Sequence, residues 1–220
     1  MPVFVEPRRF NPVRQKFESF LKSAIAYCSK RGLEMRFEAV GRADRGIVTV
    51  GDGPDDGFRF GYSLVCTGAE VPDPWETGDL VYAALRDSVW NTVDRDVADM
   101  GDRFVLRLTD RNDRSVVHTC EVSVTARDAD GAFMIRRRDA VTGACGFHRV
   151  DGTAGYDGMV ESLHADGRPS KAVRRGCLRR MTEHPDRCTA VVYAEVVRDL
   201  HRCESRSDCD FRIHPSVTQT

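Results

Sequence analysis

The sequence lacks the features that most readily identify an enzyme class or a membrane protein. No stretch approaches the roughly 20 consecutive apolar residues that span a bilayer. The G-x-S-x-G elbow, the P-loop, the dinucleotide fingerprint and the zinc pattern H-E-x-x-H are all absent. The first nine residues contain no long apolar core, so we expect no secretory signal. These absences predict a soluble, intracellular protein with no membrane partner, either cytoplasmic or packaged in a viral particle.

Closely spaced cysteine pairs are also missing. None of the eight cysteines forms a C-x-x-C pair, the spacing that many zinc sites use. Without a secretory signal a disulfide framework is disfavoured, and most of these cysteines fall at apolar positions where a thiol packs as a small hydrophobic side chain. Cys203 and Cys209 lie in the polar C-terminal stretch and are the exceptions. In an oxidising compartment they could pair with each other or with another chain.

Lysine is scarce. Only four of the 33 basic residues are lysine, which leaves 29 arginines, and the formal net charge of −1 conceals this asymmetry. Two explanations stay open. One is the coding bias of a GC-rich genome, and the other is arginine selected for forked recognition of phosphate or carboxylate groups.

What the sequence does contain is a pattern of helices and strands that fits one domain of 220 residues. Apolar spacings of three and four predict helices at 11–31, 77–100 and 170–184. Short or alternating apolar segments predict strands at 33–40, 47–50, 58–66, 103–109, 115–127, 132–138, 145–150 and 188–200, with a loop at 152–167. Short turns between strands favour antiparallel pairing. We therefore expect an α+β domain over 1–200, a mostly antiparallel, strongly curled sheet or barrel with three flanking helices, and a flexible polar tail at 201–220.

Charged residues on one face of several predicted strands are the most informative feature. Glu34, Arg36 and Glu38 share one face of the first strand. Similar charged faces on later strands contain Arg107, Arg136, Arg138 and Glu195. On an open sheet such residues form an ordinary solvated face, whereas in a closed sheet they line a polar tunnel. A tunnel of this kind holds a divalent metal on its carboxylates and a polyphosphate on its guanidinium groups.

The predicted helix at 170–184 is rich in arginine. An apolar stripe contains Val173, Cys177 and Met181. Off this stripe lie Arg174, Arg175, Arg179 and Arg180. The helix either contacts the phosphates of a nucleic acid or presents a solvated basic face balanced by nearby acidic residues.

The segment Leu33-Glu34-Met35-Arg36-Phe37, directly after an amphipathic helix, resembles the opening strand of the tunnel-type, metal-dependent RNA triphosphatases of fungi and large DNA viruses. The later basic strands, the arginine-rich segment 173–180 and the acidic position Glu195 resemble further elements of that family. There are also departures from the family's pattern. Gly32 occupies the position of the family's first glutamate, Glu38 replaces a glycine, and the segment 193–197 has one glutamate where the family has two or three.

The resemblance implies a metal-dependent chemistry. Glu34 and Glu195 would bind magnesium or manganese, and water would attack the phosphoryl group of a nucleoside triphosphate or an RNA 5′ end. The charge on that group would be stabilised by Arg36, Arg107, Arg136 and Arg138. Two versions stay open, an active triphosphatase and a degenerate relative that only binds polyphosphate. The alternative from another class is a non-catalytic structural or interaction protein, such as a component of a viral particle, with protein partners.

Overall fold

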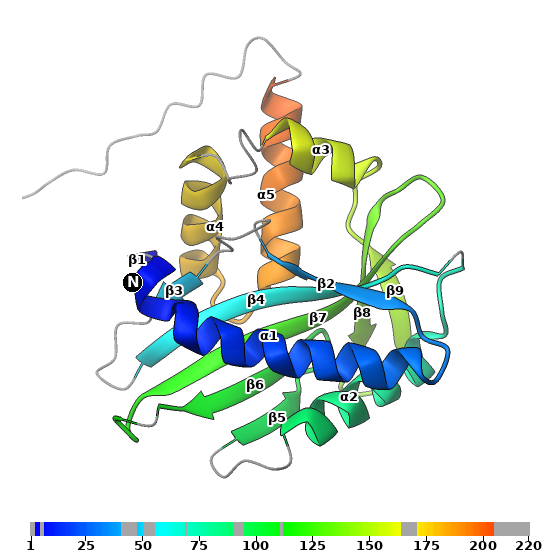
Figure 1. Cartoon of the computed structure of the whole chain (residues 1–220). Coiled ribbons are helices and arrows are strands. Elements are labelled where there is room, and N and C mark those ends of the chain that lie inside the picture. The colour runs from blue at the N-terminus through cyan, green and yellow to red at the C-terminus, as the bar shows by residue number, and fades with distance from the viewer. Residues whose placement is uncertain are drawn as a thin grey trace, which may run out of the picture.

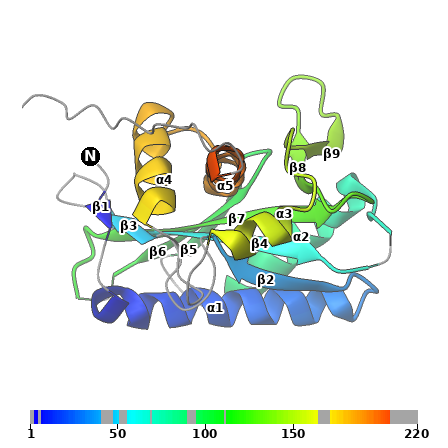
Figure 2. The same ribbon diagram turned by 90° about the horizontal axis from the view of Figure 1, so that it is seen from above.

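The computed structural model describes residues 3–4, 7–40, 48–50, 56–68, 70–89, 95–110, 112–163 and 171–204. Within them a nine-stranded mixed sheet lies between two layers of helices (Figures 1 and 2). The strands are β1 (Val3–Phe4), β2 (Met35–Ala39), β3 (Val48–Val50), β4 (Asp56–Cys66), β5 (Arg95–Asp99), β6 (Phe104–Thr109), β7 (Val117–Arg127), β8 (Phe133–Arg138) and β9 (Cys145–Arg149). The helices are α1 (Pro7–Ser29), α2 (Pro74–Val89), α3 (Tyr156–Ser162), α4 (Lys171–Glu183) and α5 (Thr189–Glu204).

The sheet has one parallel pair at its centre. Its order is β1-β3-β4-β7-β6-β5, with β2 also paired to β4, and with β8 between β7 and β9. β4 runs parallel to β7, with Leu64 opposite Val124, and the other pairs are antiparallel. A parallel pair needs a long crossover connection, and here the chain passes through α2, β5 and β6 between the two strands.

Strand β7 is buried on both faces and sends alternate side chains to the two helical layers. Cys120, Val122 and Val124 belong to the core that the sheet forms with α1 and α2. Glu121 and Ser123 point to the opposite face, where they contact the beginning of α5. Because successive side chains of a strand point to opposite faces of the sheet, β7 contributes to the packing on both sides of the sheet.

Helices α1 and α2 cover one face of the sheet (Figure 2). Phe10, Phe17 and Leu21 of α1 are at most 2% exposed, and they recur at the spacings that keep side chains on one face of a helix. Val81 and Leu85 of α2 are fully buried in the same core. The amphipathic pattern in the sequence thus predicts the position of α1 correctly.

Helices α3, α4 and α5 cover the opposite face. The first turns of α5 are buried on every side, since each residue from 190 to 194 is at most 5% exposed. The backbone N–H of Thr189 donates to Oε2 of Glu121 at 3.1 Å, and its hydroxyl donates to the same oxygen at 2.5 Å. A carboxylate at the positive end of a helix is stabilising, so β7 fixes where α5 begins.

Three predicted elements differ in the structure. The segment 188–200 is predicted to be a strand, but its residues 189–200 form part of helix α5. A segment buried on all sides shows no amphipathic period, so its sequence does not distinguish a helix from a strand. The helix predicted at 77–100 is α2 followed by β5, and the loop predicted at 152–167 contains α3. The described residues therefore contain five helices rather than three.

The α+β class is confirmed, and seven of the eight strand pairs among the described residues are antiparallel, as expected, but the strongly curled sheet or barrel is wrong. Among the described strands, β1, β5 and β9 each pair with one neighbour only, so the sheet is open. Its two central strands are parallel, which the short turns did not predict. No tunnel can form in such a sheet because neither face is enclosed by strands.

The C-terminal part of the described chain is helical. Helix α5 passes residue 200 and ends at Glu204, and residues 205–220, including Cys209, lie outside the described residues. None of the described helices combines the length and the hydropathy of a membrane span.

Candidate functional site

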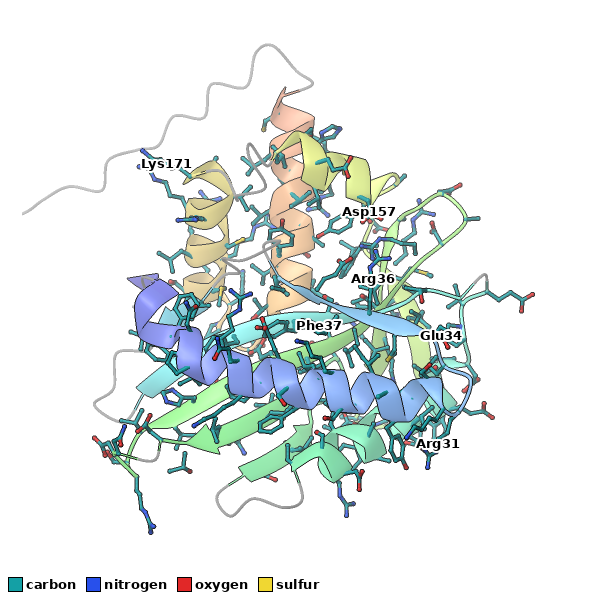
Figure 3. The ribbon with its side chains drawn as sticks, viewed as in Figure 1. Arg31, Glu34, Arg36, Phe37, Asp157 and Lys171 are labelled. Atoms are coloured by element: carbon teal, nitrogen blue, oxygen red, sulfur yellow. The ribbon has the colours of Figure 1, made fainter. Side chains whose placement is uncertain are left out.

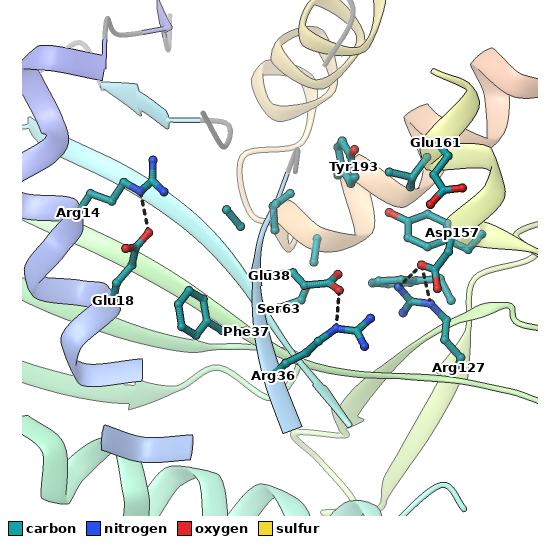
Figure 4. Close-up of a pocket in the computed structure, with 16 residues that line it drawn as sticks. Arg14, Glu18, Arg36, Phe37, Glu38, Ser63, Arg127, Asp157, Glu161 and Tyr193 are labelled. Atoms are coloured by element: carbon teal, nitrogen blue, oxygen red, sulfur yellow. Dashed lines mark hydrogen bonds and ion pairs between the residues drawn. The ribbon is translucent and has the colours of Figure 1, made fainter. Parts of the chain in front are cut away.

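A cavity of about 640 Å³ lies where the edge strand β2 meets helices α1, α3 and α5. Strands β4, β7 and β8 contribute further residues to its wall. Its volume falls within the roughly 300–1,000 Å³ of small-molecule sites in proteins. Charged and aromatic side chains share the lining, as the close-up in Figure 4 shows.

Strand β2 supplies a charged pair to this cavity. Arg36 and Glu38 are two residues apart and share one face of the strand, and Nε of Arg36 donates to Oε1 of Glu38 at 2.8 Å. Their side chains are 56% and 42% exposed. Among the described residues, the two terminal nitrogens of Arg36 have no hydrogen-bond partner. Arg36 is thus a guanidinium with most of its donors open to the cavity.

Arg127 at the end of β7 is held much more firmly. Its Nε and Nη2 both donate to Oδ1 of Asp157, at 3.3 and 2.9 Å, and its Nη1 donates to the carbonyl oxygen of Ala126 at 3.4 Å. The guanidinium also lies 5.3 Å from the ring centroid of Phe133 and 4.9 Å from that of Tyr156, which are cation–π distances. All three guanidinium nitrogens of Arg127 donate hydrogen bonds within the protein, so this side chain forms part of the cavity wall.

A third pair lies on α1. Nε of Arg14 donates to Oε1 of Glu18 at 2.7 Å, and the Tyr62 hydroxyl donates to the same oxygen at 3.1 Å. Burial alone would lower the pKa of Arg14, but the hydrogen bond and charge of Glu18 outweigh it, so the pKa is raised. Burial also raises the pKa of Tyr62, which therefore stays a neutral donor. In the view of Figure 4 the β2 pair lies between this pair and Arg127–Asp157.

The rest of the cavity is lined by apolar and aromatic side chains. Phe133, Tyr156 and Tyr193 are at most 5% exposed, and the rings of Phe133 and Tyr156 lie 5.0 Å apart. Burial raises the pKa of Tyr156 well above its ordinary value, so this ring remains uncharged. Val160 and Ala190 complete a wall on which a planar group can pack.

The charges of the cavity nearly balance. Three arginines face four carboxylates, namely those of Glu18, Glu38, Asp157 and Glu161. All three arginines pair with a carboxylate, but the side chains of Arg14 and Arg127 are only 19% and 16% exposed. That of Arg36 is 56% exposed, so Arg36 is the cation best placed to meet a ligand. The cavity therefore suits a molecule with a flat ring and a compact anionic group, which a guanidinium fork binds through two donors.

Of the six residues predicted for triphosphatase chemistry, only Arg36 lines this cavity. Arg107 pairs with Asp96 of β5 at 3.2 Å, and Arg138 pairs with Asp99 at 3.1 Å. Arg136 is 3% exposed, and its Nε donates to the carbonyl oxygen of Pro74 at the start of α2.

The two predicted metal ligands belong to separate hydrogen-bond networks. Glu34 precedes β2 and accepts a hydrogen bond from the Ser29 hydroxyl at 2.9 Å. Glu195 lies on α5, where its carboxylate accepts from Arg180 and Arg187 at 2.9 and 2.6 Å. In the described part of the chain, no group of three or more His, Cys, Asp or Glu side chains is placed to hold a metal ion. These residues do not fit the expected magnesium or manganese site.

The arginines of α4 have different environments. Arg175 and Arg179 are exposed, and Arg174 is half-buried. Arg180 turns toward α5 and pairs with Glu195 and Asp199.

Sequence patterns did not reveal most of the cavity. Arg127, Asp157 and Tyr193 come from β7, α3 and α5, and only the fold brings them together. The alternation in β2 does place Arg36 and Glu38 on one face, and it is the single local signal that points to the site.

The sequence matches no known protein family and no curated protein. The fold resembles parts of solved structures. The CD-NTase CdnG of Bradyrhizobium diazoefficiens, in complex with GTP, is 12% identical with a TM-score of 0.46, over 74% of this chain and 44% of that one. DncV of Vibrio cholerae, in its 3′-deoxy ATP bound form, is 10% identical with a TM-score of 0.48, over 80% and 60%. CdnC of E. coli MS115-1 with ATP is 11% identical with a TM-score of 0.42, over 90% and 62%.

This chain spans between 44% and 62% of the length of these three proteins. Identities of 10–12% and TM-scores below 0.5 carry no activity over to it. No RNA triphosphatase and no viral protein is among these neighbours. The described sheet is open, and Glu195 lies on a helix rather than on a closing strand. The expected relation to tunnel-type RNA triphosphatases is therefore wrong, and so is the expected polyphosphate tunnel. The viral-particle alternative is likewise without support.

Proposed function

We propose that this chain is a nucleotide-binding domain and that the cavity beside β2 is its site. The observation that carries the proposal is one juxtaposition: the open guanidinium of Arg36 faces the same cavity as the buried rings of Phe133, Tyr156 and Tyr193. A nucleotide combines the two matching chemistries in one molecule, since it has a planar base and a phosphate. The proposal concerns binding and assigns no bond-breaking step.

The phosphate binds to the terminal nitrogens of Arg36. A planar guanidinium matches two phosphate oxygens at once, and hydrogen bonds to charged groups contribute about 1.5–3 kcal/mol each. Glu38 already occupies Nε of Arg36, and its negative charge opposes an incoming anion. Affinity is therefore set by a competition between the ligand's phosphate and the carboxylate of Glu38.

The base packs on the apolar wall formed by α3, α5 and β8. Aromatic contacts of this type contribute about 0.5–1.5 kcal/mol beyond the area that they bury. The Arg127–Asp157 pair keeps the rings of Phe133 and Tyr156 in place, so this wall is formed before the ligand arrives. A site that is formed in advance loses less entropy on binding.

Isothermal titration calorimetry with AMP, GMP, ATP, GTP and adenosine tests the proposal. ATP and GTP are included because structures of similar fold contain them. We expect Arg36→Gln to weaken AMP binding by about tenfold or more, as one or two lost charged hydrogen bonds require, and to leave adenosine binding unchanged.

The matched control is Arg31→Gln. Arg31 is an exposed arginine five positions earlier, its guanidinium lies 3.6 Å from the Tyr27 ring centroid, and it does not line the cavity (Figure 3). Binding of no nucleotide by the wild type, or an equal loss in both variants, would contradict the proposed site.

A further inference from the structure

Helix α4 carries a line of exposed cations, here called the basic ridge, that consists of Lys171, Arg175 and Arg179. All three are exposed. They are four residues apart, so they lie on one side of the helix along about 12 Å of its axis. Lys171 points away from α5 in Figure 3.

The orientation of this ridge is fixed by close packing of α4 on α5. Val173 and Cys177 are at most 1% exposed on the inner side of the helix. A Cβ atom on Gly176 would lie 2.8 Å from Cγ1 of Val196, so only glycine allows the two helices to approach this closely. Arg180 then joins α4 to α5 through Glu195 and Asp199. The ridge cannot rotate inward without breaking these contacts.

The cations of the ridge are weakly neutralised. Helix α4 contains five basic residues and one acidic residue. Glu183 lies 3.9 Å from Arg179, with side chains 54% and 62% exposed, and such a surface pair contributes about 0–1 kcal/mol. Within the described residues, Lys171 and Arg175 form no ion pair. The ridge therefore keeps most of its positive charge.

We propose that the basic ridge binds the phosphate backbone of a nucleic acid. A straight row of fixed cations complements a linear polyanion, and neutralising its phosphates releases condensed counterions. A membrane surface fits less well, because helices that lie on a bilayer insert an apolar face, and the apolar face of α4 is buried against α5. The proposal is independent of the nucleotide site, since no residue of α4 lines the cavity.

Fluorescence anisotropy with a short fluorescein-labelled single-stranded RNA, repeated over a range of salt concentrations, tests this proposal. With three phosphate contacts, the slope of log K against log salt should be about −2. The triple variant Lys171→Gln/Arg175→Gln/Arg179→Gln should bring that slope close to zero and weaken binding at low salt by at least about tenfold. The single change Arg175→Gln, which keeps the helix otherwise intact, should reduce the slope by about 0.7.

The control removes the same number of charges elsewhere, in Arg31→Gln/Arg86→Gln/Arg114→Gln, three exposed arginines that lie outside α4. This variant should keep the wild-type slope, and circular dichroism checks the fold of every variant. Failure of the wild type to bind RNA at low salt would overturn the proposal. So would equal losses in the two triple variants, or binding to phosphatidylserine vesicles without binding to RNA. None of these outcomes bears on the calorimetry of the nucleotide site.

Discussion

At the scale of single residues, Gly57 shows how closely β4 and β7 approach. A Cβ atom at this position would lie 2.5 Å from Nδ1 of His118 and 2.6 Å from the carbonyl oxygen of Val117. Gly57→Ala should therefore lower the free energy of unfolding by about 1–3 kcal/mol through overpacking. Urea denaturation measures this change.

The matched control for that substitution is Gly158→Ala. Gly158 lies inside α3, and a Cβ atom there would meet nothing within 4 Å. Alanine at this position should raise stability by about 0.5–1 kcal/mol, because glycine is the weaker helix former. Equal effects of the two substitutions would show that the close approach at Gly57 is absent.

A second residue-scale feature is the histidine that follows this contact in β7. Nδ1 of His118 accepts from the N–H of Phe58 at 3.0 Å, so its proton lies on Nε2, which donates to Oδ2 of Asp110 at 3.1 Å. The hydrogen bond from His118 lowers the pKa of Asp110 most, and a second one from the backbone N–H of Asn112 lowers it further. A carboxylate whose pKa is lower in the folded state stabilises the fold above its unfolded pKa of about 3.9, and this contribution is lost as pH falls through the folded pKa.

Asp110→Asn should therefore lower the free energy of unfolding by up to about 1 kcal/mol near neutral pH. The effect is limited because the carboxylate is partly exposed. The difference from the wild type should begin to shrink as the pH falls below about 3.9 and should disappear once the pH is below the lower folded pKa. Urea denaturation across this pH range is the measurement, with the exposed Asp79→Asn as control. A pH-independent difference would contradict the role assigned to this hydrogen bond.

At the scale of elements, the α4–α5 contact depends on a glycine that helix propensity alone would replace. In Gly176→Ala the higher helix propensity of alanine contributes about 1 kcal/mol to stability. The added methyl group is forced against Val196, whose branched side chain has little freedom to move. We expect a net loss of about 1–2 kcal/mol. Val196→Ala alone should cost about 2 kcal/mol through the cavity that it leaves.

The double variant separates this explanation from a general weakening of α4. If the two side chains compete for one space, the double variant should lose less stability than the two single variants lose together, and the difference should be at least about 0.5 kcal/mol. Thermal and urea denaturation of the four proteins give this coupling energy. Additive losses would mean that Gly176 and Val196 do not meet.

Amphipathic elements could be predicted from the sequence, and fully buried ones could not. Helix α1 shows its apolar face as a period of three to four, and β2 shows an alternation of charged and apolar residues. The buried start of α5 has no polar face, so its valines indicated a strand although it is a helix. Its position depends on Glu121, a residue of β7 that is distant in the sequence.

At the scale of the whole molecule, the topology decides what the charged strand faces do. Alternation places Arg36 and Glu38 on one face whether a sheet is open or closed, so the sequence pattern alone could not exclude a barrel. The structure pairs β2 with β4 only, as an edge strand. Its charged face consequently meets α3 and α5 and forms one side of a cavity between layers (Figure 4). The wall residues that come from β7, β8, α3 and α5 lie more than 80 positions away in the sequence, and no local pattern joins them to β2.

The most direct test of nucleotide binding at this cavity is the affinity of Glu38→Gln for AMP, measured by titration calorimetry beside Arg36→Gln. The two residues form one ion pair, so a merely structural role predicts that both variants weaken binding. If Arg36 binds the phosphate in competition with Glu38, the two variants must change affinity in opposite directions. We predict that Glu38→Gln binds AMP about three- to tenfold more tightly, since a competing charge is removed, while Arg36→Gln binds it at least about tenfold more weakly. Weaker binding by both variants, or no binding by the wild type, would contradict a nucleotide site beside β2.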